Sequence, residues 1–431
     1  MKAPSQGGLV RAIGRWSLTA LVVNSILGSA VFGLPSVMAG LLGRLSLWAY
    51  VIAALVTLLT VACYAEVASR FTEAGAAYLY TRHAFGSFLG IQVAWVSWLV
   101  RISAAAANAN IFTQYLAELF PASNSGAVRI AILTALLGML AAVNYRGVRS
   151  GTQLSNVFTA AKLVPLLIFV IAGAAYLALH HEGLVRSAPV SATGADWLQA
   201  VLLLAFAYGG FDGALMPMAE ARNPRRDAPF ALFTALALLT ALYIAVQMIV
   251  QAVLPEPTAS TRPLAAAARV FLGNGGAVLM TVGAMLSVYG YLSAQTLNTP
   301  RLTYALAEHR EFPPAFAAVH ERFRTPYISI IAFATAVWML AVVGDFRWNA
   351  TLSAISRLFS YGAVCAALPV LRRKAAPPAA FQLPAGDLIA SLAVLFSILL
   401  LTRMGKLELY FMLATALLAL GTWWWARGRR S

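Results

Sequence analysis

The sequence predicts an all-α protein that crosses a membrane several times. Of its 431 residues, 61% are apolar and only 11% are charged, whereas soluble domains carry roughly 25% charged residues. Stretches such as 16–43, 228–255 and 270–300 contain no charge at all. Each exceeds the roughly 20 apolar residues that cross hydrocarbon as a helix. We therefore expect a polytopic bundle of transmembrane helices and no soluble domain.

Twelve apolar segments are long enough to be membrane spans. The predicted spans are 16–42, 46–69, 86–117, 127–145, 153–179, 196–219, 229–254, 275–300, 326–344, 348–371, 386–403 and 408–426. An even number places both termini on one side. Lys and Arg residues are more numerous in the connections on that side, so the positive-inside rule predicts cytoplasmic termini in the inner membrane of the cell.

The net charge of +16 could suit a nucleic-acid-binding protein, but here the basic residues lie between apolar spans. We interpret them as topology signals and expect membrane lipid, not nucleic acid, around the chain. The five histidines fall in connections and show no metal-ligand spacing, so no metal and no cofactor are expected. Cys63 and Cys365 lie in apolar segments, and we expect no disulfide between them.

Spans 1 and 6 are interrupted by residues that break helices. Residues 24–35 read NSILGSAVFGLP, and residues 206–213 read FAYGGFDG. Glycine and proline also occur in ordinary membrane helices as packing or kink residues. However, interruptions at the first spans of two five-span halves point to a transporter site at the midplane. We expect non-helical backbone near 28–33 and 207–213.

An unwound segment in the membrane has defined chemistry. It frees backbone N–H groups at the start of one half-helix, and these can hold a carboxylate. Carbonyls freed at the end of the opposing half-helix can hold an ammonium. Together they fit the zwitterionic unit of an amino acid.

The motifs at these positions resemble those of the amino acid–polyamine–organocation superfamily of permeases. Residues 28–32, GSAVF, resemble its G-[ST]-G-[IV]-F motif, with Ala30 in place of the third glycine. Residues 206–212 resemble F-x-Y-x-G-F-[DE], and residues 220–226 match E-x-x-N-P-x-[KR]. Residues 73–86 resemble the family's loop after span 2, and 300–313 its segment after span 8.

This resemblance implies a five-plus-five inverted repeat (LeuT-like) with broken helices 1 and 6. Spans 1–5 would form the first repeat, 16–180, and spans 6–10 the second, 196–374. Spans 11 and 12, at 386–426, would be peripheral, and 1–15 and 427–431 would be cytoplasmic tails. The family implies transport of amino acids or related amines by proton symport or by exchange. It also implies substrate contacts from the broken spans, at Ile26, Leu27, Gly28, Ser29, Ala30, Phe206, Ala207, Tyr208 and Gly209.

Lys162 lies deep in span 5, where a charge is costly and requires a partner. Its position resembles that of a lysine which, in sodium-independent members, stands where relatives bind sodium. We expect it to contact span 1 carbonyls near Ser25 and Leu27 and a span 8 hydroxyl, with Ser287 favoured over Ser293. A fixed ion pair or a carbonyl-bound structural lysine is the alternative.

Other polar and aromatic residues within the spans are candidates for the pocket or its gates. Each has a structural alternative, such as helix packing or joining. Asp212 could pair with either membrane arginine or stabilise the broken helix. The candidates are Arg101, Asn108, Phe211, Asp212, Tyr289 and Arg357.

A membrane enzyme would need a catalytic cluster, and the spans contain no His pair or carboxylate dyad. A channel would show a pore ring, and a receptor a ligand domain. Transport of an amino acid is therefore the predicted function. Because Asp212 is the only evident carboxylate near the expected site, neutral L-amino acids are favoured, with cationic amino acids or polyamines as the alternative.

Overall fold

The computed structural model describes residues 14–71, 76–147, 152–180, 191–215, 223–308, 311–374 and 378–428. Within these ranges all regular structure is helical. Two of the motif segments, 73–75 and 220–222, lie outside the described residues. So do most of the predicted N-terminal tail and residues 429–431.

Each predicted span overlaps a helix, and the helices follow the apolar segments because a backbone in hydrocarbon must satisfy its own hydrogen bonds. The α-helices are α1 (Arg15–Ile26), α2 (Ala30–Leu42), α3 (Ser46–Ala68), α4 (Ala76–Phe85), α5 (Ser87–Leu116), α6 (Gly126–Arg146), α7 (Thr152–Leu179), α8 (Gly194–Tyr208), α9 (Phe211–Ala214), α10 (Pro224–Val253), α11 (Pro263–Glu308), α12 (Tyr327–Val343), α13 (Phe346–Arg373), α14 (Gly386–Leu401) and α15 (Lys406–Gly428).

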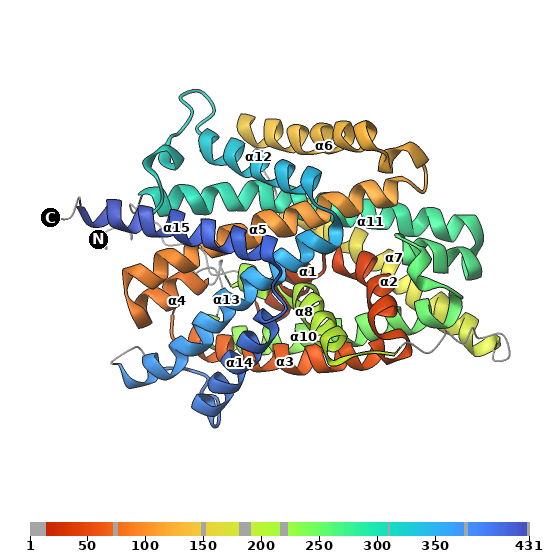
Figure 1. The fold of residues 1–431 in the computed structure, drawn as a ribbon, viewed down its shortest axis with the longest axis horizontal. Coiled ribbons are helices and arrows are strands. Elements are labelled where there is room, and N and C mark those ends of the chain that lie inside the picture. The colour runs from red at the N-terminus through yellow and green to blue at the C-terminus, as the bar shows by residue number, and fades with distance from the viewer. Residues whose placement is uncertain are drawn as a thin grey trace, which may run out of the picture.

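The chain is an integral, multi-pass membrane protein. Nine helical stretches of the described residues are long and apolar enough to cross a membrane, and α12 and α14 are shorter apolar helices. The count of twelve crossings and the inverted repeat stay predictions. In Figure 1, α5, α11 and α12 run along the long axis of the molecule, while α1, α2 and α8 lie near its middle. Helix α5 contacts α11, α12 and α13, so it forms the centre of the bundle.

Three stretches predicted as connections are helical instead. Helix α4 occupies 76–85, between the second and third predicted spans. Helix α11 begins at Pro263, twelve residues before the predicted span, and changes direction at Gly273, whose φ is +64°. It also continues to Glu308, so the connection predicted at 301–325 begins later. These segments were missed because their alanine and polar content is typical of helices outside the hydrocarbon rather than of spans.

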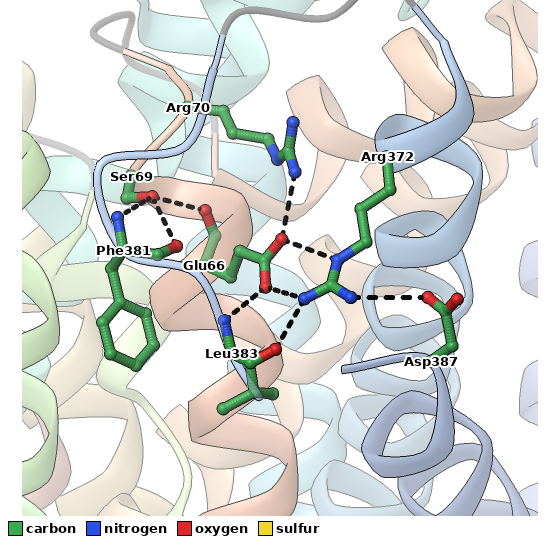
Figure 2. A network of polar contacts seen from close by, with 7 residues as sticks. All are labelled: Glu66, Ser69, Arg70, Arg372, Phe381, Leu383 and Asp387. Carbon is green, nitrogen blue, oxygen red and sulfur yellow. Dashed lines mark hydrogen bonds and ion pairs between the residues drawn. The ribbon is translucent and has the colours of Figure 1, made fainter. Parts of the chain in front are cut away.

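The bundle has two ends, the η1 end and the α4 end. The η1 end is where α2 finishes at the 3-10 helix η1 (Gly43–Leu45), and the α4 end is where α3 finishes, just before α4. At the α4 end, Glu66 of α3 is fully buried and is shared by two arginines (Figure 2). Its carboxylate accepts hydrogen bonds from Arg70 at 3.0 Å and from Arg372 at 2.6 and 2.9 Å.

The same carboxylate also binds the chain after α13. The Leu383 N–H donates to Glu66 at 2.8 Å, and Arg372 donates to the Leu383 carbonyl at 2.8 Å (Figure 2). Ser69 exchanges hydrogen bonds with the backbone of Phe381. This Glu66 network, defined as Glu66, Ser69, Arg70, Arg372, Phe381 and Leu383, joins α3 to α13 and to the segment leading into α14.

Candidate functional site

The two predicted interruptions are present and lie against each other. Helical hydrogen bonding stops at residues 27–29 between α1 and α2, so residues 30–33, expected to be unwound, are helical. It stops again at Gly209 and Gly210 between α8 and α9, so residues 207–208 and 211–213, expected to be unwound, are helical too. Gly210 has a φ of +106°, and a Cβ there would lie 2.7 Å from the Ser25 carbonyl oxygen. Only glycine permits this backbone contact at that conformation.

The first interruption is held open by a side chain of α5. The Ser29 N–H donates to Asn108 Oδ1 at 3.1 Å, while Asn108 Nδ2 donates to the Ala104 carbonyl at 2.8 Å. Asn108 is therefore a positioning residue for the unwound segment. Because the first N–H groups of a helix have no intrahelical partner, the start of α2 is a suitable place for a carboxylate. Residues 26–30 are all buried.

Lys162 of α7 reaches the same interruption. It is 3% exposed, and its Nζ lies 3.3 Å from the Leu27 carbonyl oxygen and 3.4 Å from that of Asn24. The Leu27 contact was expected, whereas Asn24 takes the place of Ser25, whose carbonyl faces Gly210. The structure gives no hydrogen bond to the buried Ser287 hydroxyl among the described residues.

The second interruption is bordered by one carboxylate and its partners. Asp212 Oδ2 lies 3.9 Å from Arg101 Nη2 of α5, and Asp212 Oδ1 accepts a hydrogen bond from the Tyr361 hydroxyl of α13 at 2.9 Å. The same hydroxyl accepts the Gly210 N–H at 3.2 Å. Tyr361 therefore joins the backbone of the interruption to Asp212, and the sequence analysis did not single it out. One helical turn separates it from Arg357, which is the signal that could have found it.

Arg357 of α13 lies directly on the second interruption. A Cβ at Gly209 would be 2.2 Å from Arg357 Nη1, so the glycine makes room for the guanidinium. The Arg357 Cζ lies 5.9 Å from the centroid of the Phe206 ring, in cation–π range. The side chain is 5% exposed. Its Nε and Nη1 atoms are buried without a hydrogen-bond acceptor in the part of the chain that the structure describes.

Aromatic residues cover the second interruption on the side that faces the α4 end. Phe211 is fully buried and contacts Tyr64 of α3 at 5.1 Å and Tyr361 at 4.9 Å between ring centroids. Tyr208 is also buried, but its hydroxyl donates to the Tyr50 carbonyl at 3.2 Å, away from Arg357. Tyr208 thus packs between helices rather than over the interruptions.

Two side chains of α11 differ in their relation to the first interruption. Tyr289, a predicted pocket residue, is half-buried and packs against the core. Tyr291 instead approaches Gly28, with its Cδ2 atom 3.8 Å from where a Cβ would lie. Ala30 and Ala207, from the two broken segments, line one narrow gap beside Tyr50.

A pocket of about 400 Å³ lies at the η1 end. It is lined by residues of α2 and by Phe346, which packs on Phe206 with ring centroids 6.3 Å apart. A Cβ at Gly33 would be 2.5 Å from the Phe346 ring. Phe346 therefore separates the pocket from the interruptions, while Phe211 and the Glu66 network cover the opposite side.

The ion pair between Arg82 of α4 and Glu311 adds to the closure of the α4 end, with an N–O distance of 2.6 Å. Burial alone would lower the pKa of Arg82, but the Glu311 carboxylate and Tyr78 outweigh it and raise this pKa above its usual value. The guanidinium therefore stays charged at any physiological pH.

Comparison with known proteins gives one coherent result. A family model described as "Amino acid permease" matches residues 13–425. The methylthioribose transporter of Bacillus subtilis is 26% identical over 85% of this chain and 82% of its own length. The branched-chain amino acid permease BcaP of the same organism is 25% identical over 96% and 92% of the two chains. Its serine/threonine exchanger SteT is 28% identical over 75% and 74%.

Proposed function

Because this chain belongs to the amino acid permease family, we propose that it is a secondary transporter that moves L-amino acids across the inner membrane by alternating access. Its relatives are transporters rather than enzymes. The names of these relatives specify methylthioribose, branched-chain amino acids, and serine and threonine. Similarity alone therefore does not identify the substrate of this chain. The assignment must come from the residues at the two interruptions.

The α-carboxylate binds the backbone N–H groups at Gly28 and Ala30, beside the Ser29 N–H that Asn108 holds, where the positive end of the α2 dipole adds to the attraction. The ammonium binds carbonyls freed at the ends of α1 and α8, from Ile26 and residues 206–209, next to the Leu27 carbonyl that Lys162 contacts. The contact between Ser25 and Gly210 supports this arrangement, since it brings the two interruptions within reach of one small molecule.

In this proposal Lys162 takes the place of a sodium ion, and the observation that supports it is the contact of Lys162 with the end of α1. Its ammonium lies at hydrogen-bond distance from Asn24 and Leu27 carbonyls at the end of α1, where a free cation would otherwise be coordinated. A covalently attached cation ties α7 to the broken helix and makes transport independent of sodium. A purely structural lysine would make the same contacts, and only the transport assay separates the two.

The test is uptake of radiolabelled amino acids into proteoliposomes, with and without a sodium gradient. Wild-type uptake should be the same in both conditions. Lys162→Met, which keeps the length of the side chain and removes its charge, should lower uptake by about tenfold or more, equivalent to at least about 1.4 kcal/mol. The control is Lys406→Met, at the exposed start of α15.

Sodium-driven uptake by the wild type, or full activity of Lys162→Met, would refute the role of this lysine. Proton symport and exchange are both compatible with it. Uptake driven by an imposed proton gradient, compared with uptake driven by internal unlabelled substrate, distinguishes them.

The cationic alternative is disfavoured by the contacts of Asp212. Its two carboxylate oxygens already face Arg101 and Tyr361, so a cationic side chain would have to compete with an arginine for it. A substrate without a positive side chain, as expected from the sequence, meets no such competition.

A further inference from the structure

The charges around the two interruptions do not balance. Arg101, Lys162 and Arg357 are each less than 10% exposed, and Asp212 is the carboxylate that lies among them in the described part of the chain. Asp212 is within 4.0 Å of Arg101 only. Lys162 is held by neutral carbonyls. Counted over the described residues, the interior site thus carries an excess of positive charge.

Arg357 is the residue at which this excess is uncompensated. The described residues place no carboxylate within 4.0 Å of its guanidinium. One polar neighbour is the Tyr361 hydroxyl, which already donates to Asp212. Two of its three guanidinium nitrogens, Nε and Nη1, are buried without an acceptor.

A buried arginine in this condition is energetically unfavourable. Removing a guanidinium from water is costly unless an anion and further hydrogen bonds replace the lost hydration. Within a membrane such residues mark binding sites or ion pathways. The planar guanidinium matches a carboxylate with two parallel hydrogen bonds, which are stronger than those between neutral groups.

We propose that the substrate is an amino acid with an acidic side chain, and that Arg357 binds its side-chain carboxylate. The inference rests on the proposed function, because the α-carboxylate and the ammonium are taken to lie at the two interruptions. Arg357 extends over Gly209 at the edge of that site, so a side chain of two or three carbons can reach it. Arg101, 3.9 Å from Asp212, adds a second positive charge near the site.

The first experiment measures binding to the purified protein in sodium-free buffer. Unlabelled L-aspartate, L-glutamate, L-glutamine, L-leucine and L-lysine each compete with a radiolabelled mixture of the same five amino acids. We expect L-aspartate or L-glutamate to compete about tenfold or more better than L-glutamine, as one charge-assisted carboxylate–guanidinium pair would provide. Competition by neutral amino acids with no effect of the acidic ones would overturn this inference and leave the proposed function intact. If none of these compounds binds, the proposed function fails as well.

The second experiment assigns the preference to Arg357. Arg357→Gln should abolish the preference for L-glutamate over L-glutamine while binding of L-glutamine persists, and Arg357→Lys should keep part of it. The control is Arg403→Gln, an exposed residue after α14. Equal losses for acidic and neutral amino acids would show that Arg357 binds the α-carboxylate instead and would overturn the inference. If Arg357→Gln does not fold, Arg357→Lys and the wild-type competition series still decide it.

Discussion

Two groups of buried charges in this protein differ in how completely they are paired. In the Glu66 network, one carboxylate accepts hydrogen bonds from two arginines and one backbone N–H. Around the interruptions, and among the described residues, Arg357 has two buried nitrogens without an acceptor, and Lys162 contacts neutral carbonyls at 3.3 and 3.4 Å. The paired charges lie at one end of the bundle, and the unpaired charges lie at its centre.

This difference indicates two roles for buried charge. A satisfied network fixes a packing arrangement, here α3 against α13 and the chain before α14, and needs nothing else to be stable. An unsatisfied arginine costs stability until a ligand supplies its partner. We therefore infer that arginine has a structural role at Arg372 and a functional role at Arg357.

Breaking the paired group should have the largest effect on stability. Glu66→Gln removes the carboxylate that Arg70 and Arg372 share, and removing one partner of a buried ion pair costs about 3–5 kcal/mol. We expect the free energy of unfolding to fall by this amount, measured by SDS titration in mixed micelles.

The matched control is Asp387→Asn. Asp387 lies 3.8 Å from the same Arg372 but its side chain is 61% exposed, so its removal should cost no more than about 1 kcal/mol. Equal effects of the two substitutions would show that the network is not the clamp inferred from its contacts.

Filling the space above the second interruption should have an intermediate effect. Gly209→Ala places a methyl group where Arg357 Nη1 now lies, and overpacking of this kind costs about 1–3 kcal/mol. We expect uptake to fall by about tenfold or more because Arg357 must move. Gly138→Ala is the control, since a Cβ there meets nothing within 4 Å. Unchanged uptake by Gly209→Ala would contradict the placement of Arg357 at the site.

The position of both interruptions could be predicted from the sequence because glycine leaves a local signal. Gly28, Gly209 and Gly210 mark the broken segments to within a few residues. The expected extent was too long, since Ala30–Gly33 and Phe211–Gly213 fold as helix. A short polar or glycine-containing stretch still forms helix when its neighbours can supply hydrogen bonds, and that depends on packing that a single sequence does not show.

The partners across the site were harder to predict. That Lys162 reaches the end of α1 followed from its depth and its resemblance to family members. Which carbonyls it contacts depends on the rotation of α1, and Asn24 rather than Ser25 faces it. In the same way, Tyr291 rather than Tyr289 faces Gly28, because residues two positions apart point in different directions from a helix. The bridging role of Tyr361 requires knowing how α13 packs on α9.

Removing a single hydrogen-bonding group should have the smallest effect. Tyr361→Phe deletes the hydroxyl that joins the Gly210 N–H to Asp212, and a typical hydrogen bond contributes about 1 kcal/mol. We expect a loss of a few-fold in uptake with little change in unfolding, and no change for Tyr410→Phe on the exposed face of α15. A loss as large as that of Gly209→Ala would mean that Tyr361 contacts the substrate directly.

The most direct test of this distinction is the effect of substrate on thermal unfolding. A ligand that binds only the folded state raises Tm in proportion to its binding free energy. The account predicts that L-glutamate in sodium-free buffer raises the Tm of the wild type and of Arg403→Gln by clearly more than it raises the Tm of Arg357→Gln. An equal rise in all three proteins, or a rise that requires sodium, would contradict it.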